Sequence, residues 1–173
     1  MIKSVYLYII YVMMLFVASM TACIEEDIMG GSNIAVGDVL PSFSVSTSDG
    51  IAVSNDSLVG YRSLVVFFNT ACGDCREELP RVDSLYRAMA TVTDFRLICI
   101  AREEGEESIA RFWKEKGLVM PYAPQDNRNV YNLFAHSIIP RIYICSADGV
   151  VRFVYGDSSL PTFAELCGNV NAL

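Results

Sequence analysis

The sequence predicts an α/β fold in which a mixed β-sheet is covered by helices on both faces. A continuous apolar run of strand length, residues 64–68, is typical of a strand buried on both faces, and residues 95–100 are predicted to form the next strand. The residues between them place apolar side chains at helical spacing, so the three segments form a βαβ unit. Two more apolar runs, joined by a turn at Asp148-Gly149, precede a last helical segment, and this ββα unit completes the sheet.

A short β-hairpin is expected ahead of this sheet. Residues 43–47 alternate apolar and polar side chains, Asp49-Gly50 is a turn sequence, and residues 51–53 return as a second strand. The strand at 64–68 follows, and the first helix opens at Arg76. The side chains that it is expected to bury are Leu79, Val82, Leu85, Tyr86 and Met89.

The second half of the domain contains three further helical segments. A helix over residues 106–116 turns Ile109, Phe112 and Trp113 inward, so Trp113 is expected in the core. The remaining elements in chain order are a short helix at 127–135, strands at 141–145 and 150–155, and a helix at 160–170. Three isolated cysteines lie in the predicted strands and the last helix and are expected to be small buried apolar residues: Cys99, Cys145 and Cys167.

The motif Cys72-Gly73-Asp74-Cys75 lies between the strand at 64–68 and the first helix. Two cysteines three apart at the first turn of a helix have Cα atoms roughly 5 to 6 Å apart, so a disulfide can form and open with little backbone movement. The free N–H groups and the positive dipole end of the helix stabilise the thiolate of the leading cysteine. Cys72 is therefore the expected nucleophile, and Cys75 the resolving thiol.

Structural explanations of the motif fit the sequence less well. A zinc site needs two more ligands at short spacing, whereas the other cysteines are scattered and His136 is the single histidine. Covalent haem attachment needs a histidine where Arg76 stands. The strand-to-helix context favours redox chemistry in which the cysteine pair itself is the redox group, with no cofactor and no metal.

Length and charge restrict the classes of partner. The 173 residues suffice for one domain with a proper core, and the formal charge is -7. Residues 1–22 contain one basic residue and no acid, so the rest of the chain has 12 basic and 20 acidic residues, a charge of -8. No basic cluster is present in the sequence, so a nucleic-acid partner is not expected.

The N-terminus has the layout of an export signal. Lys3 precedes an apolar run at residues 5–17, which is shorter than the ~20 residues of a membrane-spanning helix. Small residues and Cys23 follow, and the sequence of residues 20–23, Met-Thr-Ala-Cys, resembles a bacterial lipobox with methionine where leucine is usual. That resemblance makes Cys23 the site of lipidation. A single-pass anchor and a plain signal peptide with an incidental cysteine are the alternatives.

Residues 24–33 are acidic and then rich in small residues, without periodicity, which is typical of a tether. The acidic run after Cys23 resembles the surface-export signal of Bacteroidetes lipoproteins, although solvated linkers are often acidic as well. The predicted organisation is a lipoprotein signal peptide at 1–22, a lipidated cysteine and tether at 23–35, and a globular domain at 36–173.

From about Val36 to the C-terminus, the chain resembles the thioredoxin fold, and more closely the TlpA/ResA-like group of exported, membrane-tethered thiol-disulfide oxidoreductases. Several separate segments carry the resemblance. They are Gly37-Asp38 with Pro41 and Phe43, the segment from Phe67 to Cys75, Arg76 with Glu78 and Pro80, Ile139-Pro140, and Asp148-Gly149. The resemblance implies a thioredoxin fold with an extra N-terminal hairpin.

The resemblance also implies a substrate-binding segment. In this group the proline at the position of Pro140 is cis and lies against the active-site disulfide, and Ile139 offers its backbone to an extended substrate. An ordinary proline at the start of a strand is the alternative. Ala71 stands where a tryptophan usually precedes the first cysteine, and it leaves more open surface beside Cys72.

Proton transfer is expected to differ from that in thioredoxins. Those proteins carry a buried aspartate six residues before the leading cysteine, where this chain has Val66. Glu78 matches a glutamate that the TlpA/ResA-like group places near the site, and it shares a helix face with Cys75. We expect Glu78 to help manage the proton of Cys75. An exposed glutamate in the first turn is the alternative.

Two charged residues bear on the redox potential. A carboxylate at Asp74 raises the energy of the thiolate, which favours a reducing couple, and Arg141 after the proline acts in the opposite direction. We expect a potential closer to that of thioredoxin than to that of a strong oxidant.

These observations predict an exported, membrane-tethered thiol-disulfide oxidoreductase that reduces protein disulfides and acts as a monomer. Its expected partners are a disulfide-bearing client protein, an electron-donor protein in the membrane, and the membrane itself through the N-terminal lipid. The expected location is the cell envelope, facing the periplasm or the outer surface. The alternative is a non-catalytic binding lipoprotein that keeps the fold and holds an extended peptide at Ile139 and Pro140.

Overall fold

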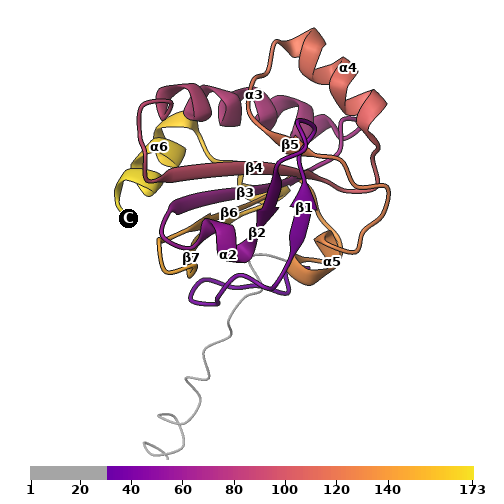
Figure 1. The fold of residues 1–173 in the computed structure, drawn as a ribbon. Helices are drawn as coiled ribbons and strands as arrows, with labels where there is room; N and C mark the ends of the chain where they lie inside the picture. The colour runs from indigo at the N-terminus through magenta and orange to yellow at the C-terminus, as the bar shows by residue number, and fades with distance from the viewer. Residues whose placement is uncertain (1–30) are drawn as a thin grey trace, which may run out of the picture.

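The computed structural model describes residues 31–173, so the predicted signal peptide and Cys23 lie outside the described residues. The centre of the domain is a five-stranded sheet in the order β5-β4-β3-β6-β7 (Figure 1). The strands are β3 (Arg62–Phe68), β4 (Phe95–Ala101), β5 (Tyr122–Ala123), β6 (Arg141–Cys145) and β7 (Val151–Tyr155). β3, β4 and β5 pair in parallel, whereas β6 is antiparallel to β3 and to β7. The predicted mixed α/β sheet is confirmed.

Helices cover both faces of the sheet. Successive side chains of β3 point to opposite sides, so this apolar strand presents hydrophobic side chains for a helix to cover on each face. The Phe67 ring contacts Phe134 with centroids 4.8 Å apart, on the face of α5 (Tyr131–Phe134). The Phe68 ring contacts Trp113 at 5.1 Å, on the face of α4 (Glu106–Lys116). Figure 1 accordingly shows α4 together with α3 (Gly73–Ala88) above the sheet, and α5 below it. β3 is thus the doubly covered central strand that its apolar run predicts.

The helix boundaries follow local signals where the signals are strong. α4 has the predicted bounds, and it ends at Gly117, which adopts φ 64° as a glycine C-cap does. The Trp113 indole is buried, and its Nε1 donates to the Met120 carbonyl at 3.0 Å. α6 (Phe163–Asn171) packs against α3 and begins three residues later than expected, because Thr162 and Glu165 form a capping box.

Some elements differ from the expectation. The helix expected at 127–135 is only α5, because the Asn127 side chain accepts the N–H of Asn129 at 2.8 Å and holds a turn there. Three short elements were not predicted from the sequence. They are β5, α2 (Asn55–Leu58) and the 3₁₀ turn η1 (Asp157–Ser159). Cys99 and Cys145 are buried as predicted, but Cys167 is only half-buried.

The predicted hairpin forms a two-stranded sheet of its own from β1 (Ser44–Ser46) and β2 (Ala52–Ser54). Its turn reaches the main sheet, since the N–H of Ser48 donates to the Tyr122 carbonyl at 2.9 Å. In Figure 1 the hairpin crosses in front of the sheet.

The first described residues already contact the domain. The N–H of His136 donates to the Gly31 carbonyl at 2.8 Å, and the N–H of Asn33 donates to the Phe134 carbonyl at 2.8 Å. Gly31 has φ 83°, a conformation that strains other residues, and a Cβ atom there would lie 1.8 Å from the Ser137 hydroxyl oxygen, so the position favours glycine. Residues 31–33, which the sequence assigns to the tether, therefore pack on the segment after α5.

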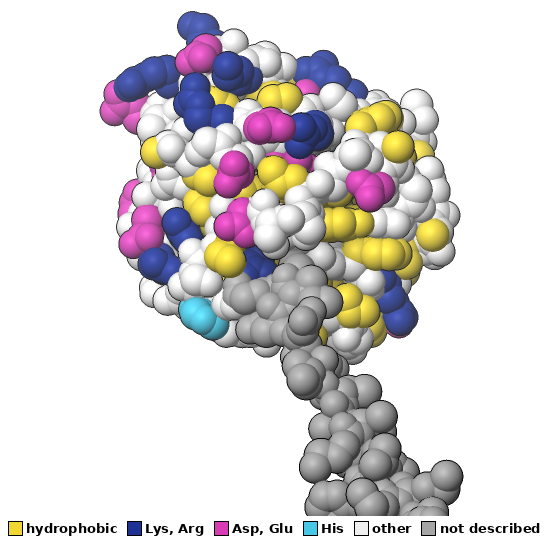
Figure 2. Space-filling view, turned by 180° about the vertical axis from the view of Figure 1, so that it is seen from behind, with side chains coloured by type: hydrophobic (Ala, Val, Ile, Leu, Met, Phe, Trp, Pro, Cys, Tyr) yellow, Lys and Arg dark blue, Asp and Glu magenta, His cyan; other side chains and the backbone are white. Residues whose placement is uncertain are grey.

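The surface carries mixed charge. On the face shown in Figure 2, acidic and basic side chains are interspersed among hydrophobic ones. Between residues 31 and 173, the structure contains no helix with the length and apolar character needed to cross a membrane.

Candidate active site

The two motif cysteines lie where β3 passes into α3. Cys72 is the N-cap of α3, and its Sγ atom accepts the backbone N–H of Cys75 at 3.4 Å. Both are free thiols in this structure. Cys72 is half-buried and Cys75 is fully buried. An N-cap position directs the leading sulfur at the unpaired N–H groups of the helix, where negative charge is stabilised.

The environment of Cys75 disfavours its thiolate. Burial raises the pKa of Cys75, and its hydrogen bond with the Cys72 sulfur raises it further. The guanidinium of Arg102, at the end of β4, acts in the opposite direction. Cys75 therefore holds its proton near neutral pH, and a resolving role requires an acceptor for that proton.

The segment before β6 lies against the leading cysteine. The thiol of Cys72 donates to the Ile139 carbonyl at 3.5 Å, and the Ile139–Pro140 peptide bond is cis. Ile139 and Pro140 are buried, whereas Ala71 is exposed beside Cys72. The structure thus brings together Cys72, Ala71, Ile139 and Pro140, which lie as much as 69 positions apart in the sequence.

Glu78 is fully buried, so the alternative of an exposed first-turn glutamate is wrong. Its Oε2 accepts from Arg81 Nη1 at 2.8 Å, and among the described residues its Oε1 has no hydrogen-bond partner. Burial raises the pKa of Glu78, although the pairing with Arg81 opposes the shift. No hydrogen bond within residues 31–173 joins Glu78 to Cys75. The Glu78 carboxyl group nevertheless lies buried in the same helix, about one turn beyond Cys75.

The other charged residues of interest differ in exposure. Asp74 is exposed in the first turn of α3. Arg141 is 1% exposed, directly after the cis peptide bond. Val66, at the position where thioredoxins carry an aspartate, is fully buried and pairs with Cys99 and Ile142 in the sheet.

The loop that carries Cys72 is held by residues that sequence analysis did not identify. Asn69 accepts the N–H of Ala71 at 2.9 Å and donates to the Arg102 carbonyl at 3.0 Å. Glu104 accepts both the N–H and the hydroxyl of Thr70. The turn propensity of Asn69 is a local signal, but Glu104 is 34 residues from Thr70 and leaves no local signal.

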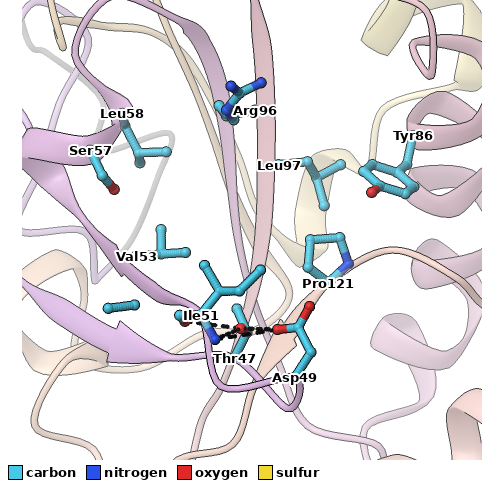
Figure 3. A pocket seen from close by; sticks show the side chains of 11 residues that line it. Thr47, Asp49, Ile51, Val53, Ser57, Leu58, Tyr86, Arg96, Leu97 and Pro121 are labelled. Carbon is cyan, nitrogen blue, oxygen red and sulfur yellow. Dashed lines mark hydrogen bonds between the residues drawn. The ribbon is translucent and has the colours of Figure 1, made fainter.

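A cavity of about 360 Å³ lies elsewhere, beside the hairpin (Figure 3). It is lined by Arg96 and Leu97 at the start of β4, whereas Cys72 follows the end of the parallel strand β3, at the opposite edge of the sheet. Two of its polar groups, the Thr47 hydroxyl and the Ile51 N–H, bond within the β1–β2 turn. This cavity is not part of the cysteine site.

Comparisons with known proteins agree with the fold and with the motif. Residues 36–154 match the AhpC/TSA family. The thiol-disulfide oxidoreductase ResA of Bacillus subtilis is 23% identical over 128 residues, which cover 73% of this chain and 71% of that protein.

Two solved structures extend the likeness. A candidate protein disulfide isomerase from Bacteroides thetaiotaomicron has a TM-score of 0.76 and 26% identity, and the match covers 82% of this chain and 91% of that one. A thiol:disulfide interchange protein of the thioredoxin family from Chlorobium tepidum has a TM-score of 0.68 and 26% identity, over 80% and 97% of the two chains. The predicted thioredoxin fold with an added N-terminal hairpin is confirmed.

Proposed function

This chain belongs to the AhpC/TSA family and is a thioredoxin-like thiol-disulfide oxidoreductase of the ResA type, and from that premise we propose that Cys72 and Cys75 reduce disulfides of client proteins in the cell envelope. One observation supports these roles above all others. Cys72 is the half-buried N-cap of α3, with its sulfur 3.5 Å from the Ile139 carbonyl, while Cys75 is sealed beneath it.

The Ile139 carbonyl offers an extended client a place to bind. A client segment that lies along residues 138–140 donates a backbone N–H there, a small case of strand addition. The exposed Ala71 leaves the other side of Cys72 open to the client.

The reaction has two exchange steps. The Cys72 thiolate attacks one sulfur of the client disulfide, the client S–S bond breaks, and the second client sulfur leaves as a thiolate that takes up a proton. Cys75 then gives up its proton and attacks the Cys72 sulfur, so that the Cys72–Cys75 bridge forms and the first client sulfur leaves. Two electrons pass to the client, and an electron-donor protein in the membrane must return them.

Glu78 receives the proton of Cys75 in this proposal. Its burial suits the role, as does its Oε1, which has no hydrogen-bond partner among residues 31–173, and burial raises its pKa toward the pH at which a general base is useful. The buried Val66 leaves that role vacant at the position where thioredoxins have aspartate.

We propose a reducing couple, with a potential nearer the thioredoxin value of about -270 mV than the DsbA value of about -120 mV. The exposed carboxylate of Asp74 in the first turn of α3 supports this, since it opposes the negative charge of the reduced form. Equilibration with glutathione measures the potential, and a value near that of DsbA contradicts the proposal.

Export and lipidation at Cys23 rest on the N-terminal sequence alone. Metabolic labelling with an alkyne fatty acid tests them. The wild-type chain incorporates the label and sediments with membranes, and Cys23→Ser does neither. A labelled Cys23→Ser protein overturns the assignment.

Reduction of insulin disulfides tests the catalytic proposal. The purified protein, supplied with dithiothreitol, accelerates insulin precipitation, and Cys72→Ser falls to the rate of dithiothreitol alone. A wild-type protein that binds unfolded peptides without accelerating reduction supports the alternative of a non-catalytic binding lipoprotein.

A further inference from the structure

We propose that Glu104 is a positioning residue for Cys72, because its carboxylate fixes Thr70 and thereby the segment that carries the attacking sulfur. Glu104 lies in the turn between β4 and α4, and neither the motif nor the segments that carry the family resemblance include it. The inference rests on the proposed role of Cys72 as the attacking thiol.

The Glu104 carboxylate engages Thr70 through both oxygens. Its Oε2 accepts the backbone N–H of Thr70 at 2.6 Å, and its Oε1 accepts the Thr70 hydroxyl. Thr70 is 8% exposed, so water competes poorly for these groups. Hydrogen bonds to an ionised acceptor are roughly twice as strong as neutral ones. The two bonds therefore hold the backbone two residues ahead of Cys72.

A second side chain, Arg76, holds the carbonyl of Thr70. Its carbonyl accepts from Arg76 Nη1 at 3.1 Å, and the Arg76 guanidinium lies over the Phe112 ring, 4.9 Å from its centroid. The N–H, the carbonyl and the hydroxyl of Thr70 are thus all bonded, by the side chains of Glu104 and Arg76. The segment between β3 and α3 is fixed to α3 by Arg76 and to the β4–α4 turn by Glu104.

Glu104 is itself held by its backbone. Its N–H donates to the Gln125 carbonyl at 2.8 Å, and the N–H of Gln125 donates back to the Glu104 carbonyl at 3.1 Å. The preceding residue, Glu103, has φ 56°, a left-handed conformation that is uncommon outside glycine. Such conformations cluster where a function requires a particular geometry. Here the unusual turn precedes the residue that reaches Thr70.

Glu104 could act on Cys72 by positioning it or through its own negative charge, and the two explanations predict opposite shifts in the pH at which the Cys72 thiolate forms. A nearby negative charge destabilises the Cys72 thiolate, so its removal moves thiolate formation to lower pH. A displaced Cys72 loses contact with the helix N-terminus, which moves thiolate formation to higher pH. The direction of the change therefore distinguishes the two explanations.

The experiment measures iodoacetamide modification of Cys72 against pH, with the modified residue identified by peptide mass spectrometry. The variants are Glu104→Ala, Glu104→Gln and the control Glu107→Ala, which removes an exposed carboxylate from the first turn of α4. We expect the pH midpoint to rise by about half a unit in Glu104→Ala. We expect kcat/KM for insulin disulfides to fall roughly 10-fold in the same variant. Glutamine still accepts the N–H of Thr70 and can donate to its hydroxyl, so kcat/KM in Glu104→Gln should stay within about 2-fold of wild type. The same holds for the control Glu107→Ala.

Thr70 provides a second pair of variants should Glu104→Ala fail to fold. Thr70→Val keeps the shape but removes the hydroxyl, and Thr70→Ser keeps the hydroxyl, so the midpoint should rise in the first and stay unchanged in the second. The inference is overturned if the pH midpoint of Cys72 modification is unchanged or lowered in Glu104→Ala. It is also overturned if kcat/KM falls as much in Glu104→Gln as in Glu104→Ala. If Cys72 is unreactive in the wild-type protein, the proposed function fails as well. If Cys72 reacts normally in every variant, only the role of Glu104 fails.

Discussion

The thiol of Cys72 donates a hydrogen bond to the carbonyl oxygen of Ile139, 67 residues later in the chain. A thiolate or a disulfide sulfur has no hydrogen to donate, so the Ile139 carbonyl loses this partner as soon as Cys72 reacts. The same carbonyl can then accept a backbone N–H from the client. The contact links the chemistry at the Cys72 sulfur to client binding along residues 138–140, the segment proposed above.

Replacing the resolving thiol should halt the reaction at its first product. In Cys75→Ser the attack by Cys72 proceeds, but no second thiol releases the client, so mixed disulfides accumulate. Affinity purification from the native cell under non-reducing conditions recovers these adducts, and Cys72→Ser serves as the control that forms none. Adducts in Cys72→Ser, with none in Cys75→Ser, would reverse the assignment of the two thiols.

Glu78→Gln should alter the pH dependence of the resolving step. Burial raises the pKa of both Glu78 and Cys75, and with Glu78 as acceptor the rate rises as Glu78 loses its proton. In Glu78→Gln the rise should move to higher pH, where Cys75 ionises without an acceptor, and the rate near pH 7 should fall about 10-fold or more.

Rapid-mixing measurements of client release from the mixed disulfide provide this rate. Glu77→Gln is the matched control, because Glu77 also pairs with Arg81, at 2.5 Å, but is exposed. An unchanged pH profile in Glu78→Gln would remove Glu78 from the mechanism.

Asp74→Asn should make the couple less reducing. Removing an exposed negative charge near the thiolate stabilises the reduced form, so the reduction potential should rise by about 10 mV, the equivalent of a weak surface interaction. Equilibration with glutathione at two salt concentrations measures the shift, which should shrink at high salt because exposed charges are screened. A fall in potential would contradict the sign of the effect.

Asp83→Ala should destabilise the fold without touching the cysteine site. Asp83 Oδ1 accepts the N–H groups of Val119 and Met120 at 2.7 and 3.0 Å, and its Oδ2 pairs with Arg87. Its loss leaves two backbone donors without an acceptor, which should lower the free energy of unfolding by about 2–4 kcal/mol.

Urea unfolding followed by circular dichroism provides this free energy. Glu107→Ala, which removes an exposed ion pair with Arg111, should change it by less than about 1 kcal/mol. If the free energy of unfolding falls equally in Asp83→Ala and Glu107→Ala, the buried contacts of Asp83 stabilise the fold no more than an exposed ion pair does.

Elements that depend on residues close in the sequence are predicted well, whereas elements that depend on residues far apart in the sequence are not. The bounds of α4 are predictable because its apolar stripe and its terminal Gly117 are local. β5 has only two residues and is defined by parallel pairing with Cys99 and Ile100, which no local pattern reveals. The sequence overestimates the length of α5, because the Asn129 N–H bonds to the Asn127 side chain and forms a turn where helix was expected.

The same reasoning applies to the site. The cysteine motif and Ile139-Pro140 are visible in the sequence, and the structure places them in contact. The burial of Glu78 depends on packing around α3, which the helical pattern does not determine. Glu104 and Arg102 reach the site only because β4 lies beside β3, a parallel pairing that brings together residues about 33 positions apart.

The hydrogen bond from the N–H of His136 to the Gly31 carbonyl limits the distance between the domain and the lipid anchor that we propose at Cys23. It fixes Gly31 to the loop that leads toward Ile139, and eight residue-to-residue steps along the chain separate Gly31 from Cys23, the proposed site of acylation. Whatever the path of the chain, eight such steps span at most about 29 Å. With Cys23 acylated as proposed, the domain would therefore stay close to the lipid headgroups, and it would react only with clients located at the membrane surface.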